Sequence, residues 1–155
     1  MENFAPDDGA DRKLLRVLLV EDDETDARIV FLFAGMSEKY RFDLTHVRDM
    51  DKAWHAIATE DFDLCLLDYW VGHQTSLRLL SSLDGGARRI ATVVLSNISS
   101  REVENMRIGA GAAFFLSKGD CSAKNLENAV QTALRSAGGG LAVSSPVMGA
   151  ASAQT

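Results

Sequence analysis

Phe62-Asp63-Leu64-Cys65-Leu66-Leu67-Asp68 is a short apolar run that ends in a carboxylate. A continuous apolar run of this length predicts a buried strand. A charged aspartate at the edge of a core is costly unless another group pairs with it. A lone aspartate after a strand is more often a helix cap or a loop residue. The interpretation of Asp68 therefore depends on which residues come directly after the other predicted strands.

Three further apolar runs end in related chemistry. Residues 17–20 precede Glu21-Asp22-Asp23, residues 92–95 precede Ser96, and residues 114–117 precede Lys118. In an open parallel sheet, groups just beyond the carboxyl ends of the strands gather in one crevice. Three acids, a hydroxyl and a lysine in one crevice predict a phosphoryl-transfer site that holds a divalent cation.

The composition bounds the class of protein. The chain has 155 residues, 46% of them hydrophobic and 25% charged, which is typical of one soluble domain. Its net charge of −6 argues against broad nucleic-acid binding, which needs a basic face. No apolar run is long enough to span a membrane. The two cysteines, Cys65 and Cys121, offer no disulfide framework, so we expect a cytoplasmic protein.

Strands and helices are predicted in strict alternation. We expect a disordered, polar leader over residues 1–13, a single domain over residues 14–137, and a flexible Gly-, Ala- and Ser-rich tail over residues 138–155. The expected strands are 14–20, 41–47, 63–67, 90–95 and 113–116; the expected helices are 24–37, about 49–59, 75–83, 99–109 and one centred on 126–137, with a loop at 69–74. This order predicts an α/β fold with a doubly wound, five-stranded parallel sheet and helices on both faces.

The helix at 24–37 is unusually apolar, because hydrophobic residues cover more than one stripe of it. We interpret it as a helix buried on most sides; the alternative is that part of its surface docks a partner. In the following helix we expect Ala53, Trp54 and Ile57 to face the core.

With this order of elements, the chain resembles the receiver domain of two-component response regulators. The resemblance covers about residues 14–137 and is carried by four motifs: VLLVEDD at 17–23, LCLLDYW at 64–70, VVLSN at 93–97 and FFLSK at 114–118. It implies a flavodoxin-like sheet with strand order 2-1-3-4-5. The chain departs from the usual family pattern at five positions. Gly72 and Gly119 replace prolines, Ser76 replaces a glycine, Trp70 stands where a small or polar residue is common, and Asn97 where Ala or Gly is common.

The resemblance implies a role for each matching residue. Asp68 is implied as the phospho-acceptor, with Ser96 and Lys118 contacting the new phosphoryl group. Glu21, Asp22, Asp68 and the backbone carbonyl of Trp70 are implied as ligands of Mg²⁺. Ser96 and Phe115 are implied as the switch that alters the surface of the fourth helix, fifth strand and fifth helix.

The expected function is that of a stand-alone receiver, a signalling domain rather than an enzyme. Its expected partners are a histidine kinase or histidine phosphotransfer protein and a downstream protein target, with no nucleic acid or membrane, and we expect a monomer or weak homodimer. The alternative is a pseudo-receiver that never takes phosphate and acts as an interaction module. A flavin binder fits poorly because acids follow the first strand, and a haloacid-dehalogenase-like phosphatase fits poorly because Asp68 lacks a second aspartate two residues on.

Overall fold

The computed structural model describes residues 11–85, 90–97 and 114–138. Within these residues, strands and helices alternate as the sequence predicts. The elements are β1 (Lys13–Val20), α1 (Glu24–Gly35), β2 (Tyr40–Val47), α2 (Met50–Thr59), β3 (Leu64–Asp68), β4 (Trp70–Val71), β5 (Gln74–Thr75), α3 (Leu77–Gly85), β6 (Ala91–Ser96), β7 (Phe114–Ser117), the short 3-10 helix η2 (Lys118–Asp120) and α5 (Ala123–Gly138).

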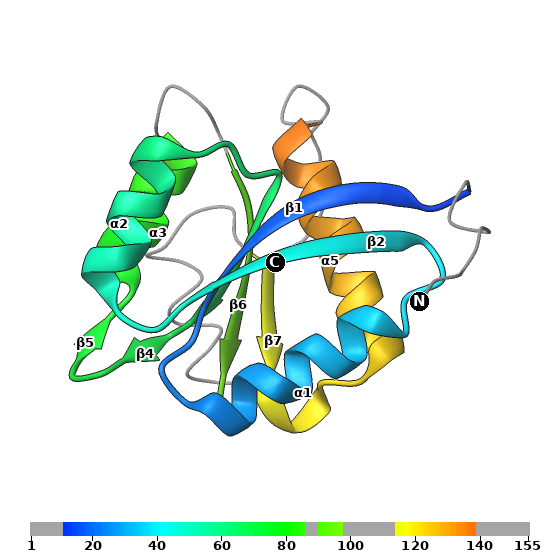
Figure 1. Ribbon diagram of the computed structural model, residues 1–155, viewed down its shortest axis with the longest axis horizontal. Coiled ribbons are helices and arrows are strands. Elements are labelled where there is room, and N and C mark those ends of the chain that lie inside the picture. Colours follow the sequence, from blue (N-terminus) through cyan, green and yellow to red (C-terminus); the bar gives the residue numbers. More distant parts are fainter. Residues whose placement is uncertain (1–10, 86–89, 98–113, 139–155) are drawn as a thin grey trace, which may run out of the picture.

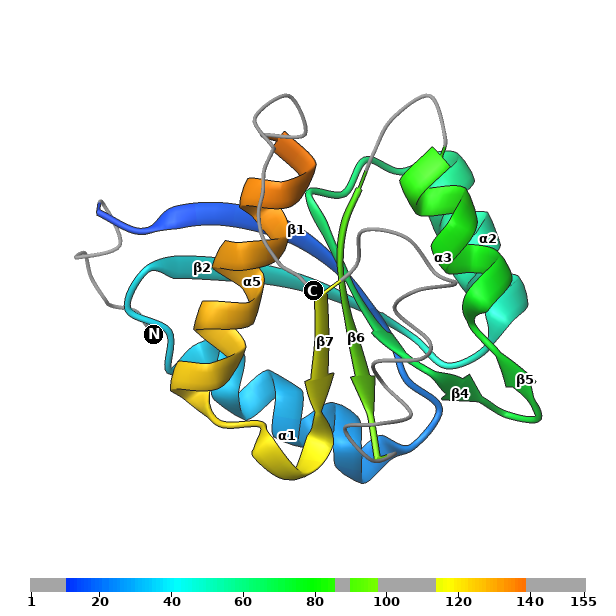
Figure 2. The same cartoon turned by 180° about the vertical axis from the view of Figure 1, so that it is seen from behind.

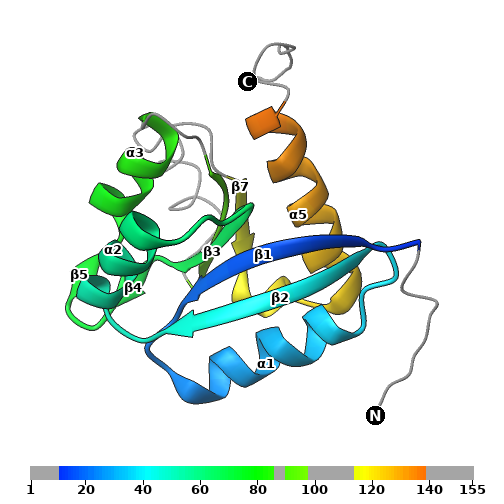
Figure 3. The same cartoon turned by 45° about the horizontal axis from the view of Figure 1, so that its top comes forward.

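Five strands form one parallel sheet in the order β2-β1-β3-β6-β7 (Figure 1). Because β6 and β7 are the fourth and fifth strands of this sheet, the predicted order 2-1-3-4-5 is confirmed. The long β1 and β2 pair along their whole length, from Lys13 opposite Tyr40 to Val20 opposite Val47, at one edge of the sheet (Figure 3). The central β3 is fully buried, as its continuous apolar run predicts.

Helices cover both faces of the sheet, and strand alternation divides the core between them. Figures 1 and 2 show α1 and α5 on one face and α2 and α3 on the other. On β3, Leu64 and Leu66 belong to the cluster on the α1/α5 side, whereas Cys65 and Leu67 belong to the cluster on the α2/α3 side. Successive side chains of a strand point to opposite faces, so this parity continues to the strand ends.

The apolar surface of α1 is only partly buried, so our interpretation of it as a helix buried on most sides was wrong. Ala27, Val30 and Ala34 pack into the core, but Ile29 is 41% exposed, Leu32 62% and Met36 58%. Ile29, Leu32 and Met36 follow a spacing of three and four, which places them along one stripe, and Phe31, which is 44% exposed, lies beside Leu32. In α2, Ala53 is buried as expected, but Trp54 is 39% exposed because it lies one helical step from Ala53, at the flank of the buried face.

Residues 69–74 form more than the predicted loop. The two-residue strands β4 and β5 pair antiparallel, with Val71 opposite Gln74 (Figure 1). Gly72, the first residue of the tight turn, has a φ of 63°, a conformation that favours glycine. The hairpin leads into α3, whose first turn is supported by the Ser76 carbonyl, which accepts from Leu80 N–H at 2.9 Å.

Three of the predicted segments fall where the structure describes little. The helix expected at 99–109, residues 1–10 of the expected leader, and the tail expected from 138 lie outside the described residues, apart from Gly138, which ends α5. β1 begins at Lys13, one residue before the expected strand. None of the helices in the described part of the chain is long and apolar enough to cross a membrane.

Candidate functional site

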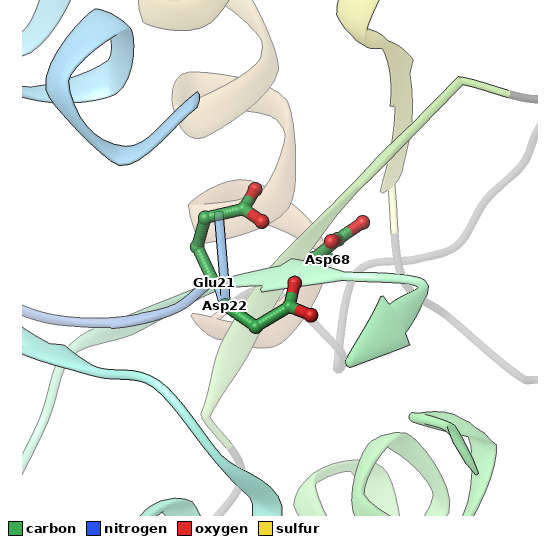
Figure 4. A group of neighbouring side chains, drawn as sticks. All are labelled: Glu21, Asp22 and Asp68. Carbon is green, nitrogen blue, oxygen red and sulfur yellow. The ribbon is translucent and has the colours of Figure 1, made fainter. Parts of the chain in front are cut away.

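Three carboxylates meet beyond the carboxyl ends of β1 and β3. Glu21, Asp22 and Asp68 each offer an oxygen, and these oxygens lie within 4.8 Å of one another (Figure 4). Parity explains the meeting of Glu21 and Asp68, because each continues the set of side chains that its strand directs to the α1/α5 side. The structure therefore brings together the three acids that the sequence singled out.

The first turn of α1 shapes the acidic end of β1. Asp23 caps the helix by accepting hydrogen bonds from Thr25 N at 2.8 Å and Asp26 N at 3.2 Å. Its own N–H donates to Glu21 Oε2 at 3.1 Å. The acidic run after β1 thus serves as a helix cap and as a candidate ligand set at the same time.

Two neighbouring elements hold the backbone and side chains of this run. The Nε2–H of His46, in β2, donates to the carbonyl of Glu21 at 2.8 Å. The backbone N–H of Gly72, in the β4–β5 turn, donates to Asp22 Oδ2 at 3.0 Å. The β4–β5 hairpin therefore contacts Asp22 directly. The loop predicted at residues 69–74 gave no indication of this contact.

Lys118 is the cation of the site and is shared among three carboxylates. Its Nζ lies 2.8 Å from Glu21 Oε1, 2.7 Å from Asp26 Oδ2 and 3.5 Å from Asp68 Oδ2. Burial acts to lower the pKa of Lys118, but the contacts with Asp26 and Glu21 and the charge of Asp68 outweigh it, so the pKa is raised. The ammonium consequently stays charged among the carboxylates.

Asp68 is the most strongly perturbed carboxylate of the group. Burial, together with the charge of Glu21, raises the pKa of Asp68 to about 7, and the nearby ammonium of Lys118 opposes this rise only in part. Clustered carboxylates raise each other's pKa when no cation neutralises them. The site therefore has more negative charge than Lys118 balances.

The carboxylate set fits a divalent cation. Among the described residues, the buried Glu21 Oε1 has no hydrogen-bond donor, since its contact with Lys118 is an ion pair outside hydrogen-bond geometry. Three clustered carboxylates still carry more negative charge than this one ammonium balances, and a hard cation with oxygen ligands neutralises such an excess. Glu21, Asp22 and Asp68 are thus suited to hold Mg²⁺, and other cations of the same class fit the same donors.

The backbone of the hairpin leaves a fourth oxygen available. Ser76 N–H donates to the Tyr69 carbonyl at 2.9 Å, so Tyr69 and Ser76 form a hydrogen-bonded pair. In an antiparallel ladder the next pair, Trp70 and Thr75, is not hydrogen-bonded, and the Trp70 carbonyl points away from β5. This is compatible with the predicted role of that carbonyl as a metal ligand.

Ser96 and Phe115 lie on the other side of the sheet. Phe115 packs against the α2/α3 cluster, and its register partner on β6 is Val94, two residues before Ser96. Ser96 is 2% exposed and shares that parity. The structure thus places the two predicted switch residues on one face of adjacent strands, opposite the face that Glu21 and Asp68 share.

Sequence reasoning missed three residues of the site. Asp26 and His46 contact Lys118 and Glu21 from α1 and β2, and the Ser76 hydroxyl donates to the Asp68 carbonyl at 2.9 Å. An acid in a first helical turn usually indicates only a favourable helix dipole, so Asp26 gave no separate signal. The other two histidines, His55 and His73, are exposed.

Comparisons with known proteins identify the family and the fold. The family model of the response regulator receiver domain matches residues 17–131. The fold is similar to the receiver domain of a Francisella response regulator (TM-score 0.65, 21% identity, 78% of this chain and 97% of that one). It is also similar to a CheY-like receiver domain protein from Methanospirillum hungatei (TM-score 0.65, 19% identity, 81% and 98%). A third similar structure is the signal receiver domain of a signal transduction histidine kinase from Syntrophus aciditrophicus (TM-score 0.66, 22% identity, 86% and 98%).

No match was found among curated protein sequences. The solved structures are less than 25% identical in sequence to this chain, so they show only the fold. The family model shows the family to which the chain belongs. The family model spans most of the chain, from the middle of β1 into α5. The chain therefore belongs to the response regulator receiver domain family, whose members act in two-component signalling.

Proposed function

We propose that Asp68 accepts a phosphoryl group from a phosphohistidine on a histidine kinase or histidine phosphotransfer protein. The observation that carries this proposal is the gathering of Glu21, Asp22 and Asp68 within 4.8 Å, with Lys118 Nζ 3.5 Å from Asp68. In the proposed step an Asp68 carboxylate oxygen forms a bond to phosphorus, the phosphorus–nitrogen bond breaks, and the imidazole leaves. The chain is an acceptor in its partner's reaction and turns over no substrate of its own.

The residues of the site match the charge changes of that step. Phosphoryl transfer places charge on the equatorial oxygens, which positioned cations and donors stabilise. Mg²⁺, held by Glu21, Asp22, Asp68 and the Trp70 carbonyl, supplies part of that stabilisation when bound. Lys118 supplies a fixed positive charge on the α1/α5 side of Asp68. Burial around Asp68 strengthens each of these interactions.

The response to phosphorylation is proposed to run through Ser96 and Phe115. A phosphoryl group on Asp68 adds negative charge and strong acceptor oxygens. The Ser96 hydroxyl is proposed to donate to one of those oxygens. Its movement then changes the space available to Phe115 on the same face. Phe115 lies in β7, so the local charge change is carried to β7 and its neighbouring helices.

The exposed apolar stripe of α1 is proposed as the docking surface for the phosphodonor protein. Ile29, Leu32 and Met36 form this α1 stripe, and α1 begins directly after the acid run of Glu21, Asp22 and Asp23. Ile29 also lines a small pocket together with Glu21 and Lys118, so the stripe is continuous with the site. A partner seated there brings its phosphohistidine close to Asp68.

The test is intact-mass spectrometry after incubation with Mg²⁺ and acetyl phosphate. We expect wild-type protein to gain one phosphoryl group, Asp68→Asn to gain none, and a chelator to abolish the gain. Asp63→Asn is the matched control, because Asp63 is an aspartate of the same segment that binds the Arg16 N–H at 2.8 Å, away from the site.

A folded wild-type protein that gains no phosphoryl group, from acetyl phosphate or from purified histidine kinases, would contradict the proposal. That result would instead favour the pseudo-receiver, an interaction module that works without phosphate. The proposed chemistry is the same whether this receiver acts alone or within a longer chain.

A further inference from the structure

Lys118 is drawn toward α1 rather than toward the proposed phospho-acceptor. Its ammonium donates a hydrogen bond to Asp26 Oδ2 at 2.7 Å, whereas Asp68 Oδ2 lies at 3.5 Å, beyond good hydrogen-bond distance. Asp26 stands outside the strand-end acids, in the first turn of α1. The ammonium therefore has two short contacts, one with Glu21 Oε1 at 2.8 Å and one with Asp26, a carboxylate that has no part in holding the metal or the phosphoryl group.

The local structure keeps Asp26 in this position. Its backbone N–H is bound by the Asp23 cap at 3.2 Å, which fixes the first turn of α1 against the end of β1. The Asp26 side chain is 31% exposed, while Lys118 is only 15% exposed, so the pair spans the boundary between solvent and the site. Both residues line a pocket of about 50 Å³, together with Ile29 and Cys121, which leaves the ammonium space to move.

We infer that Asp26 is the resting acceptor of the Lys118 ammonium and competes for it with a phosphoryl group on Asp68. The inference rests on the proposed function and adds a regulatory residue to it. The ammonium lies within 2.8 Å of Asp26 Oδ2 and Glu21 Oε1 but 3.5 Å from Asp68 Oδ2, so it must shift to donate a hydrogen bond toward Asp68. When Asp68 carries a phosphoryl group, Lys118 turns toward it and the hydrogen bond with Asp26 is lost. Asp26 thus lowers the affinity of the site for the phosphoryl group.

The competition predicts that removing the charge of Asp26 raises the affinity of the site for a phosphoryl mimic. Asp26→Asn keeps the shape of the side chain but removes its charge, so Lys118 is held less tightly in the resting state. We expect a phosphoryl mimic on Asp68 to bind about fivefold more tightly, the scale of a partly exposed ion pair. If Asp26 instead positions Lys118 for the phosphoryl group, the same substitution weakens binding.

The experiment is calorimetric titration of the full chain with beryllofluoride at saturating Mg²⁺. Beryllofluoride forms a tetrahedral adduct on a carboxylate oxygen and stands in for the phosphoryl group. The variants are Asp26→Asn and Asp26→Ala, with melting temperatures to show that each is folded. The matched control is Glu24→Gln, which removes the same charge from the same turn, where Glu24 contacts Arg48 at 3.0 Å and Arg28 at 3.9 Å.

A second pair of titrations tests whether Lys118 carries the effect. Lys118→Gln and the double variant Asp26→Asn/Lys118→Gln complete a double-mutant cycle. We expect tighter binding in Asp26→Asn, unchanged binding in Glu24→Gln, and no benefit of Asp26→Asn once Lys118 is replaced. A general electrostatic effect would give the same gain in Glu24→Gln and would persist without Lys118.

The outcomes separate this inference from the proposed function. Equal or weaker binding in Asp26→Asn, or an equal gain in Glu24→Gln, would overturn the competition while wild-type binding still supports Asp68 as acceptor. If wild-type protein binds no beryllofluoride at saturating Mg²⁺, the proposed function fails and the competition fails with it.

Discussion

The two faces of the sheet differ sharply where β1, β3, β6 and β7 end. On the α1/α5 side, Glu21, Asp68 and Lys118 form a dense cluster of charges with contacts of 2.8 and 3.5 Å to the ammonium. On the α2/α3 side, Phe115 packs against an apolar cluster, and the buried Ser96 lies on the same face. The carboxyl-end edge of the sheet thus has two halves. The charged half consists of Glu21, Asp68 and Lys118, and the other half consists of the hydroxyl of Ser96 and the ring of Phe115.

This contrast arises from the alternation of side chains along each strand. A shift of one residue moves a side chain to the opposite face, so the spacing of Asp68, Ser96 and Lys118 from their strands decides on which side each acts. The proposed chemistry and the proposed response are therefore separated by parity. Substitutions in the two halves should have distinguishable effects.

The greatest change is expected in phosphoryl loading. Lys118→Met removes the fixed positive charge and should slow loading from acetyl phosphate by roughly 100-fold, as loss of a preorganised charge does. Ser96→Ala removes one neutral donor and should slow loading by about tenfold. The rates are measured by intact mass at fixed Mg²⁺. Lys124→Met, an exposed lysine of α5, is the control, and equal rates for all three variants would erase the contrast between the two halves.

A second contrast lies within α1, between its buried face and the exposed α1 stripe. Val30→Ser places a hydroxyl in the core and should lower the free energy of unfolding by about 3 kcal/mol, whereas Leu32→Ser should change it by less than about 0.5 kcal/mol. Urea unfolding measures both. Leu32→Ser should also load normally from acetyl phosphate. A large loss of stability in Leu32→Ser would show that the stripe is structural.

The apolar runs predicted the strands of a parallel sheet and the gathering of the acids beyond their carboxyl ends, because such runs are local signals, whereas the strand order came from the resemblance to receiver domains. The sequence did not predict which apolar residues of α1 are buried. They cover more than one stripe of the helix, so more than one orientation of α1 would bury apolar residues, and packing against the sheet and α5 selects one. The β4–β5 hairpin was missed because strands of two residues show no periodicity. His46 was missed because its hydrogen bond to Glu21 depends on the register between β1 and β2.

The charged half should also respond to pH. Because the pKa of Asp68 is raised to about 7, the folded, metal-free protein keeps Asp68 protonated below about pH 7. Ionisation of Asp68 therefore reduces stability as the pH rises from the ordinary value near 3.8 to about 7. Mg²⁺ binding must displace that proton, so its affinity should rise by up to about tenfold per pH unit below pH 7 and level off above about pH 8. Calorimetry measures this rise, which Asp68→Asn should lack; a flat wild-type profile would contradict it.

The smallest effect is expected at Glu127, whose hydrogen bonds link α5 to residues 37–39, away from Asp68. Glu127 of α5 accepts from Ser37 Oγ at 2.7 Å, Glu38 N at 3.0 Å and Lys39 N at 3.1 Å, and these bonds, the Ser37 hydroxyl first, lower its pKa. Its carboxylate thus contributes stability above the ordinary pKa of 4.5, which is lost as the pH falls through the lowered value.

Glu127→Gln should therefore lower the free energy of unfolding at pH 7 by about 1 to 2 kcal/mol. The difference from wild type should shrink as the pH falls below 4.5, and phosphoryl loading of Asp68 should not change. Urea unfolding at several pH values checks the first two points. A slower loading rate in Glu127→Gln would show that this anchor also shapes the charged half.

The assignment of Asp68 is tested most sharply by locating the phosphoryl group in the chain. Reduction of an aspartyl phosphate with borohydride converts that aspartate to homoserine, and peptide mass spectrometry then identifies the position. After incubation with Mg²⁺ and acetyl phosphate, we predict homoserine at position 68 alone, with Asp22 and Asp26 unchanged. Homoserine at another acid of the cluster, or at none while position 68 is covered by the peptides, would contradict the assignment of Asp68 as the phospho-acceptor.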